Sequence, residues 1–286
     1  MLFLLQLLLV PPATDATLHA RSATAPRIAF SAFQNGQWDI YTTSPEGDDL
    51  RRLTADPYED TDPAFSPDGT RLAYASRRNG NWDIYLLDLA SGEETRLTDH
   101  PHYDGKPAWR PDGGAIAFES YRSGDLDVWL LELAPGAAPR NLTADSPAGD
   151  FDPAWDDTGD RLFFASWRAG DNDLWALTLS DGSLEQLTTS PAAETQPVWD
   201  APHRRLAFTR NTLGDADVWV QSGETATPYT WLGSVSHPAF RPDGTGIAAI
   251  WDRHRGAQLV RLDEGEPLPT YLTAPALLQG GLSWHP

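Results

Sequence analysis

Asp62-Pro63-Ala64-Phe65-Ser66-Pro67-Asp68-Gly69 is the stretch that decides the fold, because the chain repeats it. It returns as Lys106-Pro107-Ala108-Trp109-Arg110-Pro111-Asp112-Gly113, and again at Asp152–Gly159, Gln196–His203 and His237–Gly244. Its aromatic position recurs at intervals of 41 to 46 residues, at Phe65, Trp109, Trp155, Trp199 and Phe240. A period of this length indicates a repeat architecture, in which each unit packs against the next.

Each unit contains four short stretches, which we name strands A to D. Strand A carries the aromatic residue, and the Ser-Pro-Asp-Gly turn at its end suits a tight hairpin because Pro presets φ and Gly accepts a positive φ. In one unit the other strands are Leu72-Ala73-Tyr74 (B), Asp83-Ile84-Tyr85 (C) and Arg96-Leu97-Thr98 (D). Short strands separated by frequent turn signals predict an all-β fold. We interpret the Asp that opens strand C as a structural residue that binds nearby backbone N–H groups, and not as a calcium ligand.

The two ends of the repeat region complement each other. The first unit starts at Arg27 directly with strand B, and the chain closes on a spare strand A, Gly281-Leu282-Ser283-Trp284. Five complete units and one shared unit predict a six-bladed β-propeller of four-stranded blades. We expect the C-terminal strand to join the N-terminal blade, because closure removes the free strand edges that otherwise promote aggregation. We expect a monomer, with the propeller over residues 26–286.

The phrases Pro-Ala-Phe-Ser-Pro-Asp-Gly (63–69), Asp-Ile-Tyr (83–85) and Arg-Leu-Thr (96–98) resemble the repeats of the TolB-like propeller family. The resemblance covers residues 27–286. It does not extend to the smaller α/β domain that precedes the propeller in TolB. It implies a periplasmic scaffold that binds a protein or peptide, such as an envelope lipoprotein, at one propeller face. Some peptidases share this propeller and add an α/β-hydrolase domain, but the Gly-x-Ser-x-Gly nucleophile motif is absent here.

The composition argues against one class of partner, and the N-terminal sequence indicates where the protein is located. The net charge of −20 and a single lysine, Lys106, argue against a nucleic-acid-binding surface. Residues 1–10 are apolar except for Gln6, and a small, polar stretch follows as far as residue 25. The apolar run is too short to span a bilayer but resembles an export signal. We therefore interpret residues 1–25 as an export signal and tail, and we expect an extracytoplasmic protein without a membrane span.

Recurring charged residues lie in the D–A and B–C loops, which meet at one face of any propeller. An acid stands three residues before the strand A proline in four units, at Asp60, Asp104, Asp150 and Glu194. An arginine recurs in the B–C loops, at Arg78, Arg122, Arg168 and Arg253. The structural interpretation is a set of ion pairs that join neighbouring blades. The functional interpretation is a charged funnel that receives a partner.

Other residues of these loops do not recur and are better candidates for specificity: His100, His102, Tyr103, Trp167, His237 and His254. Because interface energy concentrates in Trp, Tyr and Arg, we predict Tyr103, Trp167, Arg122 and Arg168 as the main contacts of a protein partner. We expect no catalytic residue, cofactor or metal. The alternative is a lyase or hydrolase that holds a metal on these histidines in the propeller funnel.

Overall fold

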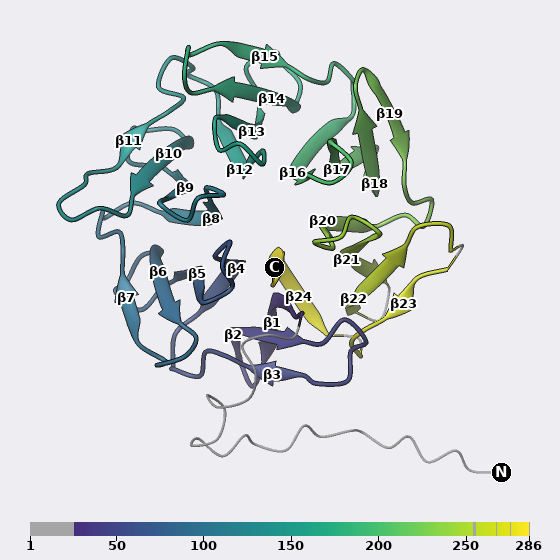
Figure 1. Ribbon diagram of the computed structural model, residues 1–286, viewed down its shortest axis with the longest axis horizontal. Helices are drawn as coiled ribbons and strands as arrows, with labels where there is room; N and C mark the ends of the chain where they lie inside the picture. Colours follow the sequence, from purple (N-terminus) through teal and green to yellow (C-terminus); the bar gives the residue numbers. More distant parts are fainter. Residues whose placement is uncertain (1–25, 254–255, 267, 275, 286) are drawn as a thin grey trace.

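Figure 1 shows six antiparallel sheets arranged as a ring around a central axis. The computed structural model describes residues 26–253, 256–266, 268–274 and 276–285, so the proposed export signal at 1–25 lies outside the described residues. Each sheet has four strands, with strand A at the centre and strand D at the rim. The predicted six-bladed β-propeller is therefore confirmed.

The strands have the following bounds. The closing blade contains β24 (Leu277–Trp284), β1 (Ile28–Gln34), β2 (Gln37–Thr43) and β3 (Arg51–Arg52). The next two contain β4 (Asp60–Phe65), β5 (Arg71–Ser76), β6 (Asp83–Asp88) and β7 (Glu94–Arg96), then β8 (Asp104–Trp109), β9 (Ala115–Ser120), β10 (Asp127–Glu132) and β11 (Arg140–Asn141). The fourth contains β12 (Asp150–Trp155), β13 (Arg161–Ser166), β14 (Asp173–Thr178) and β15 (Leu184–Gln186). The last two contain β16 (Ala193–Asp200), β17 (Arg205–Thr212), β18 (Asp215–Ser222) and β19 (Thr225–Pro228), then β20 (Val235–Phe240), β21 (Gly246–Arg253), β22 (Gly256–Asp263) and β23 (Thr270–Tyr271).

Closure of the ring follows the predicted pairing. Strand β24 runs antiparallel to β1, with Trp284 opposite Ile28 and Ser283 opposite Ala29. The backbone N–H of His285 donates to the carbonyl of Arg27 at 2.7 Å. In Figure 1 the C-terminus accordingly lies beside the central channel. The C-terminal strand thus completes the N-terminal blade.

The aromatic position of strand A joins neighbouring blades. The indole N–H groups of Trp109, Trp155 and Trp284 donate to backbone carbonyls of the preceding inner strand at 3.0, 3.2 and 2.9 Å. Each acceptor is the Ala that follows the repeated proline, as Ala64 is for Trp109. Because these three rings are also buried, one residue supplies both apolar packing and an inter-blade hydrogen bond in three of the six blades.

The Thr of strand D joins the two outer strands of each blade. Thr98 Oγ1 accepts a hydrogen bond from the backbone N–H of Ile84 at 2.9 Å. The same contact occurs in all six blades, between Thr54 and Ile40, Thr98 and Ile84, Thr143 and Val128, Thr188 and Leu174, Thr230 and Val218, and Thr273 and Leu259. This contact explains why the Leu-Thr phrase recurs.

The Asp that opens strand C is structural, but its partners differ from the prediction. Asp83 pairs with Arg96 of strand D at 2.8 Å, and Asp127 accepts from Asn141 at 2.7 Å. Only in the fifth blade does this Asp, Asp217, accept from backbone N–H groups, those of Leu232 and Gly233. The prediction of mainly backbone partners was therefore wrong, because strand D places a polar side chain within hydrogen-bonding distance of the carboxylate.

Candidate functional site

The recurring acids and arginines form ion pairs within single blades. Asp104 opens β8 and Arg122 follows β9 of the same sheet, and their side chains meet at 2.6 Å. Arg168 pairs with Asp150 at 2.8 Å in the next blade. In the fifth blade Glu194 pairs with Arg210, which lies on strand β17 and not in the predicted loop position. The prediction of pairs between neighbouring blades was wrong.

These ion pairs are buried and their arginines are stacked on aromatic rings. The side chains of Asp60, Asp104, Asp150 and Glu194 are 0% exposed. The guanidinium of Arg122, whose side chain is 11% exposed, lies over the rings of Phe118 and Trp129. Arg168 lies likewise over Phe164 and Trp175, and Arg78 over Tyr74 and Tyr85. Such groups hold the B–C loops in place and offer little surface to a partner.

Burial also changes the protonation of the acids. It raises the pKa of Asp60 to about 7 and that of Asp150 to about 6, although hydrogen bonds and the paired arginines oppose the change. Arg253 is the exception among the predicted arginines. It is exposed, lies over Trp251 and donates to the hydroxyl of Tyr271 at 3.1 Å.

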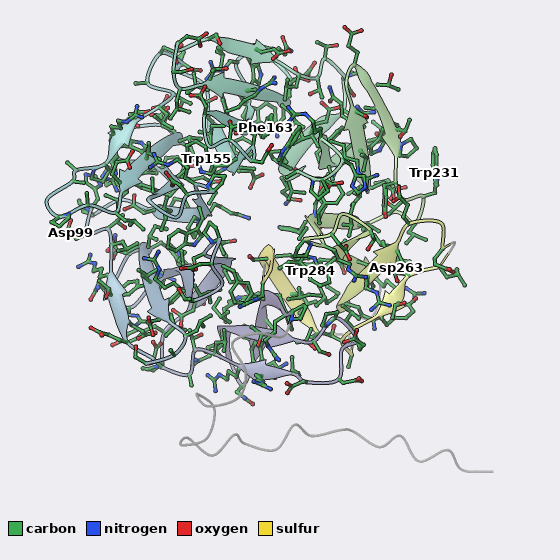
Figure 2. The ribbon with its side chains drawn as sticks, viewed as in Figure 1. Asp99, Trp155, Phe163, Trp231, Asp263 and Trp284 are labelled. Atoms are coloured by element: carbon green, nitrogen blue, oxygen red, sulfur yellow. The ribbon has the colours of Figure 1, made fainter. Side chains whose placement is uncertain are left out.

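Exposed large apolar side chains gather on the face formed by the D–A and B–C loops. Among the described residues eight large hydrophobic side chains are exposed, and five of them belong to these loops: Tyr58, Tyr121, Trp167, Leu213 and Trp231. Trp167 was predicted, and it is 50% exposed. The others were missed, although each departs from the repeat. Figure 2 shows Trp231, which is 80% exposed, at the outer edge of the ring.

The remaining predicted residues of this face differ in accessibility. His102 is exposed, and its Nδ1 lies 3.0 Å from the carbonyl oxygen of Tyr121. Tyr103 turns inward over Gly105, and its hydroxyl donates to Glu119 at 3.3 Å. Burial, together with the nearby charge of Glu119, raises the pKa of Tyr103. Tyr103 therefore supports the loop from inside the ring.

A polar ring crosses the central channel, and our sequence reasoning missed it. The residue before the strand A proline varies among the blades and is of five types in six positions: Asp62, Lys106, Asp152, Gln196, His237 and, in the equivalent position of β24, Gly281. These residues line a cavity of about 350 Å³ whose walls run along strand A to the Ser66-Pro67 hairpin. The sequence signal for this polar ring was the variation of residue type at one fixed position of the repeat, directly before the proline.

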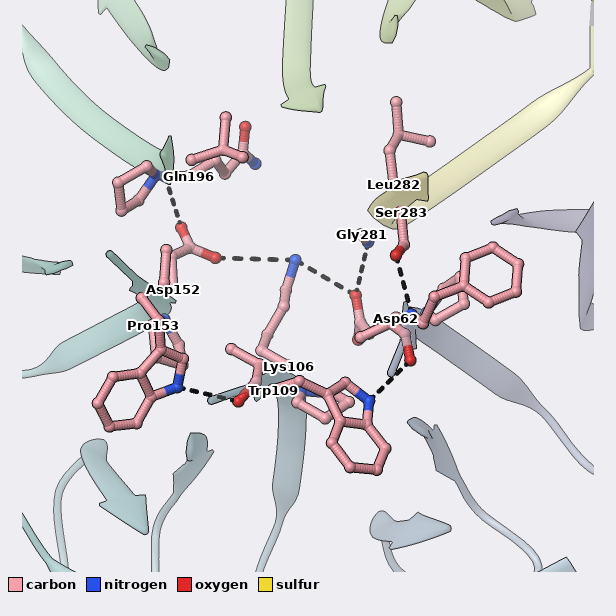
Figure 3. A pocket seen from close by; sticks show the side chains of 18 of the residues that line it. Asp62, Lys106, Trp109, Asp152, Pro153, Gln196, Gly281, Leu282 and Ser283 are labelled. Atoms are coloured by element: carbon pink, nitrogen blue, oxygen red, sulfur yellow. Dashed lines mark hydrogen bonds and ion pairs between the residues drawn. The ribbon is translucent and has the colours of Figure 1, made fainter. Parts of the chain in front are cut away.

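Lys106 lies between two carboxylates of this ring, as Figure 3 shows. Its ammonium is 3.3 Å from Asp62 Oδ1 and 3.8 Å from Asp152 Oδ1. Although burial acts to raise it, the pKa of Asp62 is lowered by Lys106 and by the N–H of Gly281. Behind the ring, burial and the charge of Asp152 raise the pKa of Glu119 to about 8, against the opposing effect of Lys106.

His237 is held neutral on the other side of the channel. Its backbone N–H and the Thr209 hydroxyl both donate to Gln196 Oε1, at 2.9 and 2.7 Å. Gln196 Nε2 is therefore the donor to His237 Nε2 at 2.9 Å, which leaves the ring proton on Nδ1 facing Ser236. Burial, with the charge of Lys106, lowers the pKa of His237 to about 3.

Comparison with known proteins agrees with this geometry. Residues 19–149 match the TolB beta propeller domain family. This part of the chain is therefore similar to TolB-like propellers. No curated protein matches its sequence. The fold is similar to that of TolB from Acinetobacter baumannii, with a TM-score of 0.81 and 20% identity over 91% of this chain and 66% of that one. The chain thus spans just under two thirds of that protein.

Propellers with other functions share the fold. The chain named for a nidogen/laminin complex has a TM-score of 0.75 at 11% identity, over 91% of this propeller and 98% of its own length. An oligogalacturonate lyase in complex with manganese has a TM-score of 0.55 at 16% identity, over 86% of this propeller and 72% of the lyase. These likenesses are to the fold alone, so function must be argued from the sites.

The histidines proposed for a metal do not meet in the part of the propeller that the structure describes. The rings of His100 and His102 lie 5.2 Å apart on the outer loop, whereas His237 faces Gln196 in the channel. His254 lies outside the described residues. Within the described ranges no group of three or more His, Cys, Asp or Glu residues could hold a metal ion. Nor do these ranges contain a helix long and apolar enough to cross a membrane.

Proposed function

We propose that this TolB-like propeller is a non-enzymatic, exported scaffold that binds a protein or peptide at the face of its D–A and B–C loops. The observation that carries the proposal is the gathering of exposed aromatic side chains on that face. Exposed Trp and Tyr side chains in number are typical of protein interfaces, where they supply large contact areas at a small cost in conformational entropy.

The structure changes which predicted residues we place in direct contact with the partner. Of the predicted residues, Trp167, His102 and Arg253 are accessible. Tyr121, which was not predicted, is accessible as well. Arg78, Arg122, Arg168 and Tyr103 instead form the layer beneath these loops, together with the buried acids. A rigid underlying layer favours binding because less conformational freedom is lost when the partner docks.

The apolar run at residues 1–10 and the resemblance to TolB-like proteins support export to an extracytoplasmic compartment. The resemblance also favours an envelope lipoprotein as the class of partner. We expect a monomeric propeller, because strand β24 of the same chain pairs with β1, so all six blades have their four strands without a second chain.

The test is capture of a partner from the native envelope fraction by the purified propeller. We expect the Tyr121→Ala/Trp167→Ala double variant to lose capture and to melt like the parent, since both side chains are about half exposed. The matched control is Asp68→Ala/Asp112→Ala on the opposite, A–B face, which should keep capture. If only the control variant loses capture, the partner binds the opposite face and our proposal is wrong.

A further inference from the structure

Four loops of the third and fourth blades form one continuous surface. The carbonyl of Tyr103 accepts from the N–H of Tyr121 at 3.2 Å, which joins loop 97–103 to loop 121–126. The carbonyl of Leu126 accepts from the N–H of Asp150 at 2.7 Å, at the end of loop 142–149. Gly149 in turn accepts from the N–H of Trp167, at 3.2 Å, in loop 167–172. We call these four loops the acidic aromatic surface.

Two aromatic and four acidic side chains are at least partly exposed on this surface. Tyr121 is 46% exposed and Trp167 is 50% exposed. Each loop also contributes one acid: Asp99, Asp125, Asp145 and Asp171. None of these four carboxylates forms an ion pair with a residue that the structure describes.

Neither the arginines of these loops nor the single lysine pairs with these acids. The two arginines of these loops, Arg122 and Arg168, are held by the buried carboxylates of Asp104 and Asp150. The single lysine lies in the central channel between Asp62 and Asp152. The surface therefore presents four carboxylates without an ion pair beside two exposed aromatic rings and two histidines, His100 and His102, on a chain with a net charge of −20.

We propose that the partner segment recognised here is basic, with Lys or Arg side chains that pair with the four acids and lie over Tyr121 and Trp167. This inference rests on the proposed function and adds the chemistry of the partner. A cation over an aromatic face is attracted by the ring, and opposite charge across an interface directs encounter and excludes wrong partners. A second copy of this acidic chain is disfavoured because the same charges would meet each other.

The probe is a fluorescent peptide of three Arg-Ser-Gly repeats, compared with peptides in which Gln or Glu replaces Arg. Binding to the full chain is followed by fluorescence polarisation at low and high salt. We expect the Arg peptide to bind, the Gln peptide to bind at least about tenfold more weakly and the Glu peptide not to bind. Salt should weaken the Arg peptide because exposed charges are screened.

Two matched variants separate this surface from general attraction to a negative chain. Asp125→Asn/Asp171→Asn should weaken the Arg peptide by about tenfold. Glu93→Gln/Glu266→Gln removes the same charge from exposed C–D loops on the opposite face, and it should leave binding unchanged. Equal loss in both variants, or equal binding of the Arg and Gln peptides, would overturn the inference.

Capture of the native partner distinguishes failure of this inference from failure of the proposed function. If capture is lost in Tyr121→Ala/Trp167→Ala but is insensitive to salt and to Asp125→Asn/Asp171→Asn, the face binds a partner that is not basic. The inference then falls and the proposed function stands. If capture survives the aromatic substitutions as well, both fall. If capture is lost in both double variants and on addition of salt, both are supported.

Discussion

Arg122 illustrates how a residue in a loop can belong to the core. Its guanidinium pairs with the fully buried Asp104 and lies against two aromatic rings, so its charge compensates a carboxylate that water does not reach. Removing one partner of such a pair leaves an uncompensated buried charge, whereas replacing both partners by apolar groups is often neutral. The pair is therefore a structural requirement of the loop that presents Tyr121.

Arg122→Met should destabilise the propeller by about 3–5 kcal/mol, because the buried carboxyl group of Asp104 loses its ion-pair partner. Chemical unfolding measures the change, and the double variant Arg122→Met/Asp104→Leu should recover most of it. Arg77→Met is the control. Its ion pair with Glu59 is exposed, 57% and 37%, and should contribute at most about 1 kcal/mol. A loss for Arg122→Met no larger than the control would show that the pair is dispensable.

Glu119 makes stability depend on pH. Its pKa is raised from 4.5 to about 8 in the folded protein, so between these values the folded state holds a proton that the unfolded state has released. Stability from this group is complete below about pH 4.5 and is lost as the pH rises through about 8.

Glu119→Gln should remove this contribution, because the amide keeps an acceptor for the Asp152 N–H and has no proton to lose in this range. Melting temperatures from pH 5 to 9 should fall less steeply for the variant than for the parent. Glu93→Gln, at an exposed position, serves as the control and should keep the parent's slope. An unchanged slope in Glu119→Gln would mean that Glu119 is ionised in the folded protein.

At the scale of single elements, the contact between strand D and strand C recurs in every blade. Strand D has only two to four residues, so its ladder hydrogen bonds to strand C are few. The threonine hydroxyl just after it supplies the acceptor for the first N–H of strand C beyond the Asp. A short outer strand thereby stays attached at the same register in each blade.

Thr98→Val should lower the free energy of unfolding by about 1–3 kcal/mol, because the shape is kept while the buried N–H of Ile84 loses its acceptor. Denaturant titration gives the value. Thr95 lies on β7 and is exposed, so Thr95→Val should change stability by less than about 0.5 kcal/mol. Equal effects of the two substitutions would contradict a specific role for the hydroxyl.

At the scale of the whole molecule, stability depends on closing the ring. Strand β24 supplies the inner strand of the first blade and buries Trp284 against the sixth, so it contacts two blades at once. Ser283 Oγ also accepts from the N–H of Phe65, which joins it to the second blade. Strand β24 thus makes contacts with the first, second and sixth blades.

Deletion of residues 281–286 should destabilise the protein severely or cause aggregation through the exposed edge of β1. Burial of the Trp284 side chain alone is worth roughly 1.5–3 kcal/mol, out of a total of about 5–15 kcal/mol for a typical protein. Thermal unfolding and light scattering measure the loss. Addition of a peptide of residues 276–286 should restore part of it. A truncated chain that melts like the parent would rule out this dependence on closure.

The fold could be predicted from the sequence because each blade of a propeller has the same local requirements, which therefore recur along the chain. The aromatic slot ending in Trp284, the Asp of strand C and the Gly of the A–B turn each recur, and Gly69 takes the predicted positive φ of 68°. Where the Gly is missing, Arg204 takes the positive φ at 51°. The sequence also determined ring closure, because the first unit lacks strand A and the chain ends on an extra strand A.

Only the tertiary structure decided which loop residues are accessible and which face the channel. Sequence spacing places Arg122, Tyr103 and Trp167 in equivalent kinds of loop, yet the first two turn inward and the third outward. Likewise, the residues before the repeated prolines lie more than 40 positions apart in sequence, and Lys106 meets Asp62 and Asp152 only because the inner strands of successive blades pack side by side. Local patterns determine strand and turn, whereas burial and charge compensation depend on neighbours that the sequence separates.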